Sequence, residues 1–321
     1  MSVEQQRGPL AWVESLGYEA YFRAFRALPI DKASAAGGAL LRAIGPRTPV
    51  HQVARTNLKL VFPDLAPERA EAILTAAWDN LGRTFAEFPH LHEIRIYEPG
   101  GRVEVVNAEG FDAAVADGRG AVFVGGHFAN WEVLAASVAQ RVPARMTYRP
   151  LNNYYVDKRI LEQRVAYGRP DQAAKGVEGG VGLMRALKDG WAVAIMNDQK
   201  YNEGVPAPFF GRMVMTADGP TRLARRFKCP LVPVGIERTE GARFRITVED
   251  PIPYIEDDDE DAAVTRTVGV INAHVERWLQ AAPEQWFWVH RRWPKEVYRA
   301  EDPPAAADRV SARMAGGERV A

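Results

Sequence analysis

Short runs of apolar residues alternate with amphipathic segments over the central part of the chain. The runs have the length and β-branched content of strands, and the segments between them repeat apolar residues at helical spacing. The expected strands are Val103–Val106, Ala121–Val124, Arg145–Tyr148, Ala192–Met196, Leu231–Ile236 and Phe244–Val248. The expected helices are Asn130–Gln140, Tyr154–Tyr167, Val181–Lys188, Thr216–Phe227 and Thr265–Leu279. This alternation predicts an α/β fold with a single sheet flanked by helices, mixed because the last strands follow one another closely.

The first ninety residues have a helical pattern and are expected to form an N-terminal helical subdomain. Apolar side chains recur at near-helical spacing, with arginines between them, at Trp12, Leu16, Tyr21, Phe22, Phe25 and Leu28. Such a basic amphipathic segment either packs on the body of the protein or embeds in the headgroup layer of a membrane. No apolar run reaches the roughly 20 residues that span a bilayer. We therefore expect no crossing of a membrane and no signal peptide, and the segment can still lie on a membrane surface or pack on the protein.

The pattern divides the chain into three parts. Residues 1–48 are expected to be a membrane-associating helical segment, and residues 49–300 the main domain. Residues 301–321 are expected to be a disordered tail, because they are rich in Ala, Gly, Pro and charge. The stretch Trp286–Trp293 is expected to be a packed core element with Arg291 and Arg292 exposed.

Composition narrows the function classes. The 41 basic and 41 acidic side chains give a net charge of zero, which argues against a broad nucleic-acid-binding surface. The single cysteine, Cys229, excludes an intrachain disulfide and a cysteine-rich zinc site. No base is adjacent to it in sequence, so we expect a core or strand-edge residue. The histidines show no metal-ligand spacing, and no G-x-S-x-G motif is present. Neither a metal nor an acyl-serine is predicted.

The segment GGHFANWE, residues 125–132, carries the most specific candidate chemistry. It follows an apolar strand, so His127 is expected at the carboxyl end of that strand, where open α/β sheets bind ligands. On one regular helix, His127 and Glu132 would point about 140° apart. They converge only if His127 lies in the turn before the helix. Glu132 would then fix the tautomer of His127 and support it as a general base. A histidine that is buried and satisfied by a local hydrogen bond is the alternative.

Other segments form an ordered set with this one. They are ARTNL (54–58), FPDL (62–65), NLGR (80–83), YRPLNN (148–153), the pair Asp198–Gln199, PFFG (208–211), TADGP (216–220) and QWFWVHRRW (285–293). The set resembles the bacterial lipid A biosynthesis late acyltransferases, the lauroyl/myristoyl transferase family related to glycerolipid acyltransferases. The resemblance covers roughly residues 20 to 295. Ala129 stands where glycine is common in the family, and the transmembrane helix that members commonly carry has no counterpart.

The resemblance implies a glycerolipid-acyltransferase-like fold and transfer of a fatty acyl chain from an acyl carrier protein thioester to a hydroxyl of a lipid A precursor. It implies His127 and Glu132 as the catalytic pair, and Arg149, Arg164 and Asp198 as substrate-binding positions. No metal or organic cofactor is implied. Backbone N–H groups near residues 125–127 are candidates to stabilise the oxyanion. The implied location is peripheral, on the cytoplasmic face of the cell inner membrane.

Chemistry alone leaves alternatives for several of these residues. Either arginine can clamp a phosphate or make a structural salt bridge, and Asp198 can position substrate, bind Arg164 or cap a turn. The basic cluster Arg222, Arg225, Arg226 and Lys228 fits a membrane contact, a docking site for the acidic carrier protein or a solvated face. The other functions that fit are an acyltransferase for another lipid or glycolipid acceptor, a catalytically silent lipid-binding homologue, and a hydrolase in which water replaces the acceptor.

Overall fold

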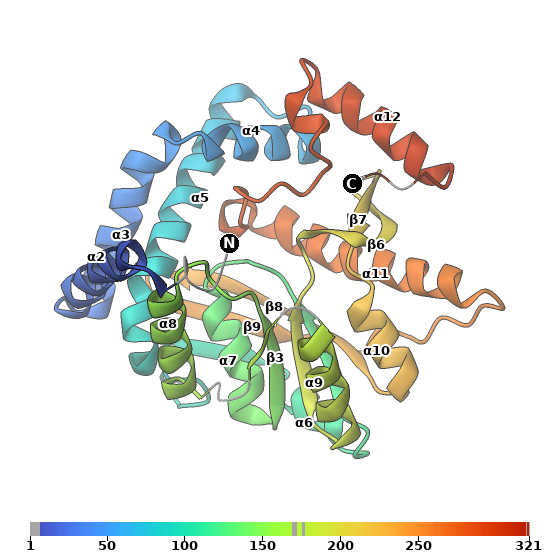
Figure 1. Ribbon diagram of the computed structural model, residues 1–321, viewed down its shortest axis with the longest axis horizontal. Helices are drawn as coiled ribbons and strands as arrows, with labels where there is room; N and C mark the ends of the chain where they lie inside the picture. The colour runs from blue at the N-terminus through green and yellow to red at the C-terminus, as the bar shows by residue number, and fades with distance from the viewer. Residues whose placement is uncertain (1–6, 169–171, 175–176, 319, 321) are drawn as a thin grey trace.

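Seven strands of the described residues form one mixed sheet at the centre of the molecule (Figure 1). The computed structural model describes residues 7–168, 172–174, 177–318 and 320. The strand order is β1-β9-β8-β2-β5-β3-β4, and every neighbouring pair is parallel except β8–β9. The strands are β1 (Val103–Val106), β2 (Ala121–Gly125), β3 (Ala144–Tyr148), β4 (Gln172–Ala174), β5 (Ala192–Met196), β8 (Leu231–Glu240) and β9 (Arg243–Val248). The predicted α/β fold with one mixed sheet is confirmed.

Helices cover both faces of the sheet, as a largely parallel sheet requires. The central strand β2 is buried at every residue. Ala121 and Phe123 belong to one apolar core, and Val122 and Val124 to another. The helices of this part are α6 (Glu109–Val115), α7 (Trp131–Arg141), α8 (Tyr154–Ala166), α9 (Val177–Lys188), α10 (Gly219–Phe227) and α11 (Glu260–Ala281). The carboxyl end of β2 is therefore a rigid, central position.

The six expected strands are all present, but the pattern missed others. Strand β4 lies on the sheet edge, and a separate antiparallel hairpin consists of β6 (Lys200–Phe209) and β7 (Arg212–Thr216). Pro206 and Pro208 lie within β6, and proline in an apolar run argues against a strand when only the sequence is read. The hairpin directly follows the end of β5, which places its first residues beside the candidate site.

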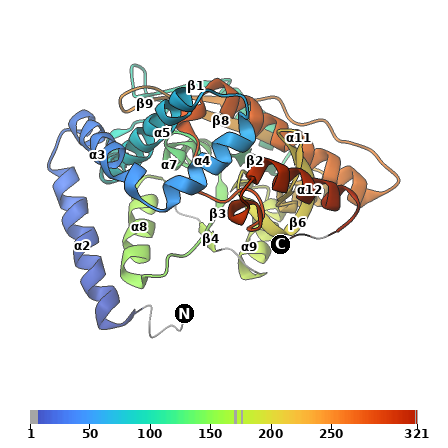
Figure 2. The same cartoon turned by 90° about the horizontal axis from the view of Figure 1, so that it is seen from above.

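The N-terminal helices are α2 (Pro9–Arg26), α3 (Ile30–Ile44), α4 (Val50–Val61) and α5 (Pro67–Glu87), with 3₁₀ turns at Gly45–Arg47 and Phe88–Glu93. Helix α3 packs closely on α5. A Cβ atom at Gly82 would lie 2.1 Å from the carbonyl oxygen of Gly37, so the two helices touch backbone to backbone. Helix α3 is therefore part of the main body, whereas α2 lies along the edge beside α8 (Figure 2). In the described part of the chain, no helix is long and apolar enough to cross a bilayer.

The C-terminal region differs from the expected disordered tail. Residues Pro303–Ala315 form helix α12, which packs on α4 and β7. Asp302 caps the helix by accepting from the Ala305 N–H at 3.3 Å, and Ala306, Ala307, Val310 and Met314 are buried. The alanines that suggested disorder instead give this helix a thin apolar face. Composition misled the prediction because it ignores the order of the residues.

Two further 3₁₀ turns, Pro283–Gln285 and Val297–Arg299, flank the tryptophan-rich segment. Trp286, Trp288 and Trp293 are at most 3% exposed, which confirms a packed core element. Arg291 is exposed as expected, but the expected exposure of Arg292 was wrong, because its side chain is fully buried. Its guanidinium donates to the Met215 carbonyl at 2.9 Å and to the Thr216 hydroxyl at 2.7 Å. Those bonds engage its two terminal nitrogens inside the core, whereas its Nε has no hydrogen-bond partner among the described residues.

Candidate active site

The loop from Gly126 to Asn130 joins β2 to α7 and carries His127. A Cβ atom at Gly126 would lie 2.8 Å from the Phe128 ring, so the tight turn needs a glycine for space. Asn130 caps α7, and its side-chain oxygen accepts from the Glu132 N–H at 3.2 Å. His127 thus lies in the turn before the helix and Glu132 in the first helical turn, as predicted.

The His127 ring is held by Asp198. Asp198 Oδ1 lies 2.7 Å from His127 Nδ1, and Asp198 Oδ2 accepts from the His127 backbone N–H at 2.9 Å. Because a carboxylate accepts the Nδ1 proton, the neutral imidazole keeps its lone pair on Nε2. The His127 side chain is 22% exposed and lines an open cleft. The arrangement orients one ring nitrogen and leaves the other suited to take a proton.

Asp198 stays ionised although it is buried. Its second oxygen also accepts from the Trp286 indole N–H at 2.8 Å. Burial by itself would raise the pKa of Asp198, but the charge of His127 and the hydrogen bonds from His127 and Trp286 hold that pKa well below its usual range. The charge of Asp198 in turn favours protonated Arg292, although burial lowers the pKa of Arg292 to about 10.

Glu132 does not make the contact that the sequence predicted for it. Both of its carboxylate oxygens accept from Arg164, from Nε at 2.9 Å and from an Nη atom at 2.6 Å. The orienting hydrogen bond to His127 comes from Asp198 instead, a residue that was predicted to bind substrate. All the same, His127, Glu132, Arg164 and Arg149 line one cleft of about 650 Å³. The structure therefore brings the five predicted residues together but pairs them differently.

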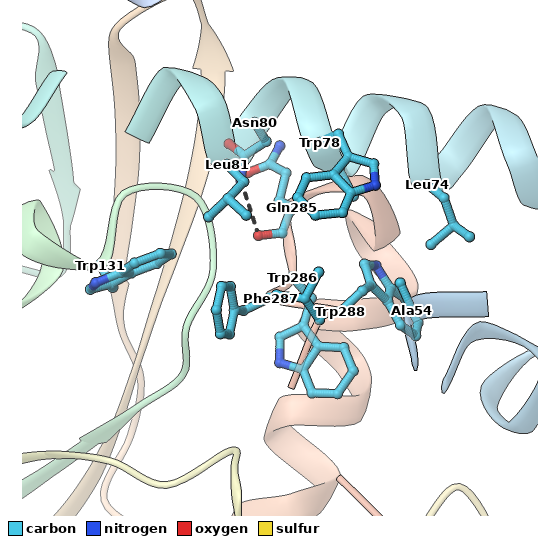
Figure 3. Close-up of a pocket in the computed structure, with 12 residues that line it drawn as sticks. Ala54, Leu74, Trp78, Asn80, Leu81, Trp131, Gln285, Trp286, Phe287 and Trp288 are labelled. Carbon is cyan, nitrogen blue, oxygen red and sulfur yellow. Dashed lines mark hydrogen bonds between the residues drawn. The ribbon is translucent and has the colours of Figure 1, made fainter. Parts of the chain in front are cut away.

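Aromatic side chains wall one side of His127. The ring centroids of Trp131 and Phe287 lie 5.5 Å and 6.1 Å from that of His127. Figure 3 shows Trp131 and Phe287 pointing into an apolar crevice between α5 and the tryptophan-rich segment, where Asn80 donates to the Gln285 carbonyl. These rings pack against the imidazole and restrict its movement.

The tryptophan-rich segment also fixes the backbone of the loop. The Phe287 N–H donates to the His127 carbonyl at 3.0 Å, and the Ala129 N–H donates to the Gln285 carbonyl at 2.9 Å. Sequence reasoning assigned no role in the site to this segment, because about 160 residues separate it from His127. Its aromatic residues predicted only that the segment packs in the core.

A buried polar network supports the end of the catalytic loop at Asn130. Glu87 is fully buried and accepts from the Asn130 amide at 2.9 Å, from Ser34 at 2.7 Å and from Arg238. The carboxylate thereby ties the cap residue of α7 to α3 and β8. Sequence reasoning missed Glu87 and Arg238, which showed no motif and lie 151 positions apart.

Other candidate residues lie away from this chemistry. In the basic cluster on α10, Arg222 pairs with Asp218 at 2.6 Å and with Asp261 at 2.7 Å, and Arg225 donates to the Ile255 carbonyl at 2.9 Å. Cys229 is buried, as expected, and burial raises the pKa of its thiol to about 11. Among the residues that the structure describes, no group of three or more His, Cys, Asp and Glu side chains could hold a metal ion.

Comparison with known families decides the class of protein. The sequence profile described as bacterial lipid A biosynthesis acyltransferase matches residues 4–295. The chain belongs to this family. It is an acyltransferase, and its activity is acyl transfer to a lipid acceptor.

Similar proteins support this assignment. The acyltransferase is 28% identical over 249 residues to the lipid A biosynthesis palmitoleoyltransferase of Escherichia coli K12, covering 75% of this chain and 78% of that protein. It is 26% identical to the lauroyltransferase of the same organism over 252 residues, with the same coverage. It is 24% identical to the phosphatidylinositol mannoside acyltransferase of Mycolicibacterium smegmatis, covering 88% and 91%. The match to a solved 1-acyl-sn-glycerophosphate acyltransferase from Thermotoga maritima covers 75% of this chain and 98% of that one, at 14% identity and a TM-score of 0.37, and it carries no argument here.

Proposed function

We propose that this acyltransferase moves a fatty acyl chain from an acyl carrier protein thioester to a hydroxyl of a lipid A precursor, with His127 as the general base. The observation that carries the mechanism is the pair His127–Asp198 at the edge of the cleft, 2.7 Å apart. It matches the requirement for a histidine whose tautomer is fixed by a buried carboxylate. The lipid A acceptor rests on the family and on the E. coli relatives.

The proposed reaction is a direct transfer. His127 Nε2 takes the proton from the acceptor hydroxyl while the hydroxyl oxygen attacks the thioester carbonyl carbon. The carbon–sulfur bond then breaks, and the imidazolium returns the proton to the leaving thiolate. Asp198 stabilises the imidazolium while it carries the proton. The products are the new ester and the free thiol of the carrier.

Two backbone donors of the catalytic loop are already engaged in hydrogen bonds. The His127 N–H donates to Asp198, and the Phe128 N–H donates to the Gly126 carbonyl at 2.9 Å. Both groups are therefore occupied in the free enzyme. In this proposal, Arg164 and Arg149 are two of the cleft cations available to the oxyanion or to the acceptor, and Glu132 fixes the guanidinium of Arg164.

The acyl chain of the donor fits a separate apolar groove. This groove, of about 600 Å³, lies between α9 and α10 and is lined by side chains such as Leu183, Met184 and Leu223. It meets the active cleft at Thr147, Met196 and Tyr201, which line both cavities. A thioester at this junction would lie beside His127. We assign the groove to the donor chain because burial of its methylene groups favours binding.

The enzyme is proposed to work peripherally at the cytoplasmic face of the cell inner membrane. The amphipathic stripe predicted for α2 is divided between two environments. Phe22 is buried against the body, whereas Leu10, Trp12, Val13 and Leu16 are between 49% and 72% exposed. At 100° per residue, those four side chains cover one side of the helix. An apolar helix face of this kind inserts into the headgroup layer.

A different glycolipid acceptor is the second candidate. The match to the phosphatidylinositol mannoside acyltransferase covers 88% of the chain, a larger share than the 75% covered by the lipid A enzymes. The same His127–Asp198 pair would serve either acceptor. Recognition of the acceptor therefore has to come from other residues of the cleft.

The proposed function predicts a measurable transfer reaction. Labelled acyl carrier protein and a purified lipid A precursor are incubated with wild type, His127→Ala and Asp198→Asn. Loss of the base should lower the transfer rate by about 10²–10⁴-fold. Asp198→Asn should lower kcat by about 10³–10⁴-fold, because an amide that donates to Nδ1 forces the proton onto Nε2.

A matched control uses a histidine outside the site. His92 is exposed and lies on the turn after α5, so His92→Ala should keep wild-type transfer. Circular dichroism checks that every variant is folded. Equal transfer by His127→Ala and wild type would rule out His127 as the base. Transfer to a phosphatidylinositol mannoside, but not to the lipid A precursor, would favour the second candidate.

A further inference from the structure

A second cavity, which we call the α10 cavity, lies at the end of the sheet opposite to the active site. Its volume is about 500 Å³, and it is bounded by α10, α11, the start of β8 and the segment after β9. It is lined by Arg119, which precedes β2, and by Leu231, the first residue of β8. Because β2 and β8 are parallel, the cavity lies at their amino ends, whereas His127 follows the carboxyl end of β2.

Helix α10 separates this cavity from the groove proposed for the donor chain. The helix lies between α9 and α11 (Figure 1). Residues at spacings of three, four and seven positions share one side of the helix and line the α10 cavity: Thr221, Ala224, Arg225 and the C-cap residue Lys228. Residues between them line the donor groove: Arg222, Leu223 and Arg226. A ligand in the α10 cavity would therefore be apart from both the cleft and the groove.

Two buried polar groups of the cavity have no hydrogen-bond partner among the described residues. They are the hydroxyl of Thr221, which is fully buried, and Nε of Arg225, whose side chain is 10% exposed. Arg225 donates from a terminal nitrogen to the Ile255 carbonyl at 2.9 Å, and its guanidinium carbon lies 4.4 Å from the centre of the Tyr254 ring. A carboxylate oxygen of Glu260 lies 3.8 Å from Nε, beyond hydrogen-bond distance. Such buried groups favour a polar ligand, because leaving them unsatisfied costs free energy.

The cavity combines positive charge with an apolar wall. Among the described residues that line it, Arg119, Arg225 and Lys228 are cations and none is acidic. Arg119 is already paired with Asp117, whereas Lys228 is exposed. The apolar wall is formed by buried side chains that belong to one hydrophobic core: Ala224, Cys229, Leu231 and Ile252. A ligand that matches this lining has a negative charge at one end and an apolar body.

We propose that the α10 cavity binds a small amphiphile with one anionic headgroup, a carboxylate or a phosphate, on a short apolar chain. The headgroup accepts from Arg225 Nε, from the Thr221 hydroxyl and from the ammonium of Lys228, and hydrogen bonds from charged donors are strong. The chain lies against Leu231 and Ile252, where burial of its methylene groups favours binding. The volume falls within the range of roughly 300–1,000 Å³ that is typical of small-molecule sites. The site does not depend on the proposed transfer reaction.

Cys229 provides a reporter for this cavity alone. It is the single cysteine of the chain, it is buried, and it lines the cavity. Its alkylation by the small, uncharged reagent N-ethylmaleimide is followed by intact mass. Octanoate or octyl phosphate, below its micelle concentration and at about ten times its Kd, should slow the alkylation about tenfold, because the bound ligand covers the thiol. Octanol and inorganic phosphate each supply one half of the ligand and should leave the rate nearly unchanged.

Two variants test the headgroup contacts. Arg225→Gln removes a charged donor and should raise the Kd of the anionic ligand at least about tenfold. Thr221→Val replaces a hydroxyl that has no partner by a methyl group, so it should keep the melting temperature and raise the Kd about twofold to tenfold. Arg226→Gln is the matched control, since Arg226 lies on the same helix but lines the donor groove, and it should keep the wild-type Kd. Calorimetry of the same proteins measures these affinities without the thiol.

The outcomes separate the possible ligands. Protection by only one of octanoate and octyl phosphate would support the site and identify its headgroup. Equal protection by octanol, or equal affinity of wild type and Arg225→Gln, would overturn recognition of an anion. Absence of binding by both octanoate and octyl phosphate would overturn the site. Protection of Cys229 by carrier protein alone would make this surface a protein contact and would also overturn it. Since no readout needs turnover, the proposed function is tested separately.

Discussion

Ala129 is the residue in the catalytic loop that carries backbone strain. Its φ angle is 44°, in the left-handed region, and its methyl group is fully buried. A left-handed conformation costs a non-glycine residue roughly 1–2 kcal/mol. Here the strain is maintained by hydrogen bonds on both sides, from the Ala129 N–H to Gln285 and from Thr84 to the Ala129 carbonyl. An alanine is thus tolerated at this position because the surroundings fix the turn.

Substitution at Ala129 should follow this conformation. Ala129→Gly removes the strain but also a buried methyl group worth about 0.8 kcal/mol, so the free energy of unfolding should change by less than about 1 kcal/mol. Ala129→Val should destabilise the protein by roughly 2 kcal/mol or more, because a β-branched side chain fits neither the φ angle nor the space. Urea denaturation measures both. A valine variant as stable as the glycine variant would contradict the assignment.

The pairing of His127 with Asp198 shows what residue-level sequence reasoning lacked. Both residues were selected, but Glu132 was given the place of Asp198. In the sheet, β2 and β5 are parallel neighbours, and Gly125 lies opposite Met196. His127 and Asp198 each come two residues after that pair, so the register brings them together. The sequence does show that His127 and Asp198 each follow a buried strand at the same distance. To infer a contact from this, one must know that the two strands are neighbours, and strand order is a property of the tertiary fold.

At the level of elements, the contact between α3 and α5 depends on the absence of side chains. A Cβ at Gly82 would lie 2.1 Å from a carbonyl oxygen of α3, whereas a Cβ at Gly17 on α2 would meet nothing within 4 Å. Gly82→Ala should therefore destabilise the protein by at least about 2 kcal/mol, because the helices must move apart. Gly17→Ala is the matched control and should be neutral or stabilising by up to about 1 kcal/mol.

Thermal unfolding of the two alanine variants gives the comparison. Because Asn80 and Glu87 of α5 contact the catalytic loop and its supporting segment, Gly82→Ala should also lower transfer. Equal melting temperatures for Gly82→Ala and Gly17→Ala would show that α3 does not pack on α5 as described.

Elements with strong periodicity were predictable, and elements with weak periodicity were not. Strands β1 and β5 were predicted with their observed bounds, because β1 lies between Arg102 and Asn107 and the apolar run of β5 ends before Asn197. Helix α11 begins at Glu260, five residues before the predicted start, because Asp259 caps it by accepting from two backbone N–H groups. Helix α12 and the β6–β7 hairpin depend on contacts with distant parts of the chain, which local patterns do not contain.

For the whole molecule, the exposed face of α2 predicts how the enzyme meets lipid. Leu10, Trp12, Val13 and Leu16 together offer apolar area whose burial is worth several kcal/mol, at roughly 1.5–3 kcal/mol for each fully buried large side chain. Replacing all four by serine should weaken binding to vesicles that contain anionic lipid by at least about tenfold, without lowering the melting temperature. Sedimentation with sucrose-loaded vesicles measures the bound fraction.

The control for vesicle binding is an exposed tryptophan elsewhere. Trp191 is 39% exposed and precedes β5, at the amino end of that strand. Trp191→Ser should bind vesicles like wild type. If the α2 variant also binds like wild type, another surface must hold the enzyme at the membrane, and the proposed role of α2 is lost.

The dependence of the catalytic loop on residues 285–293 has a consequence for biosynthesis. A ribosome makes the chain from its N-terminus, and the early part of a domain can fold while the rest is still being made. A nascent chain that has emerged as far as residue 280 contains His127, Asp198 and every other predicted site residue. It lacks Trp286, which binds Asp198, and the backbone groups that hold His127 and Ala129. The enzyme should therefore become active late in synthesis, once residues 285–293 have emerged and have packed against the catalytic loop.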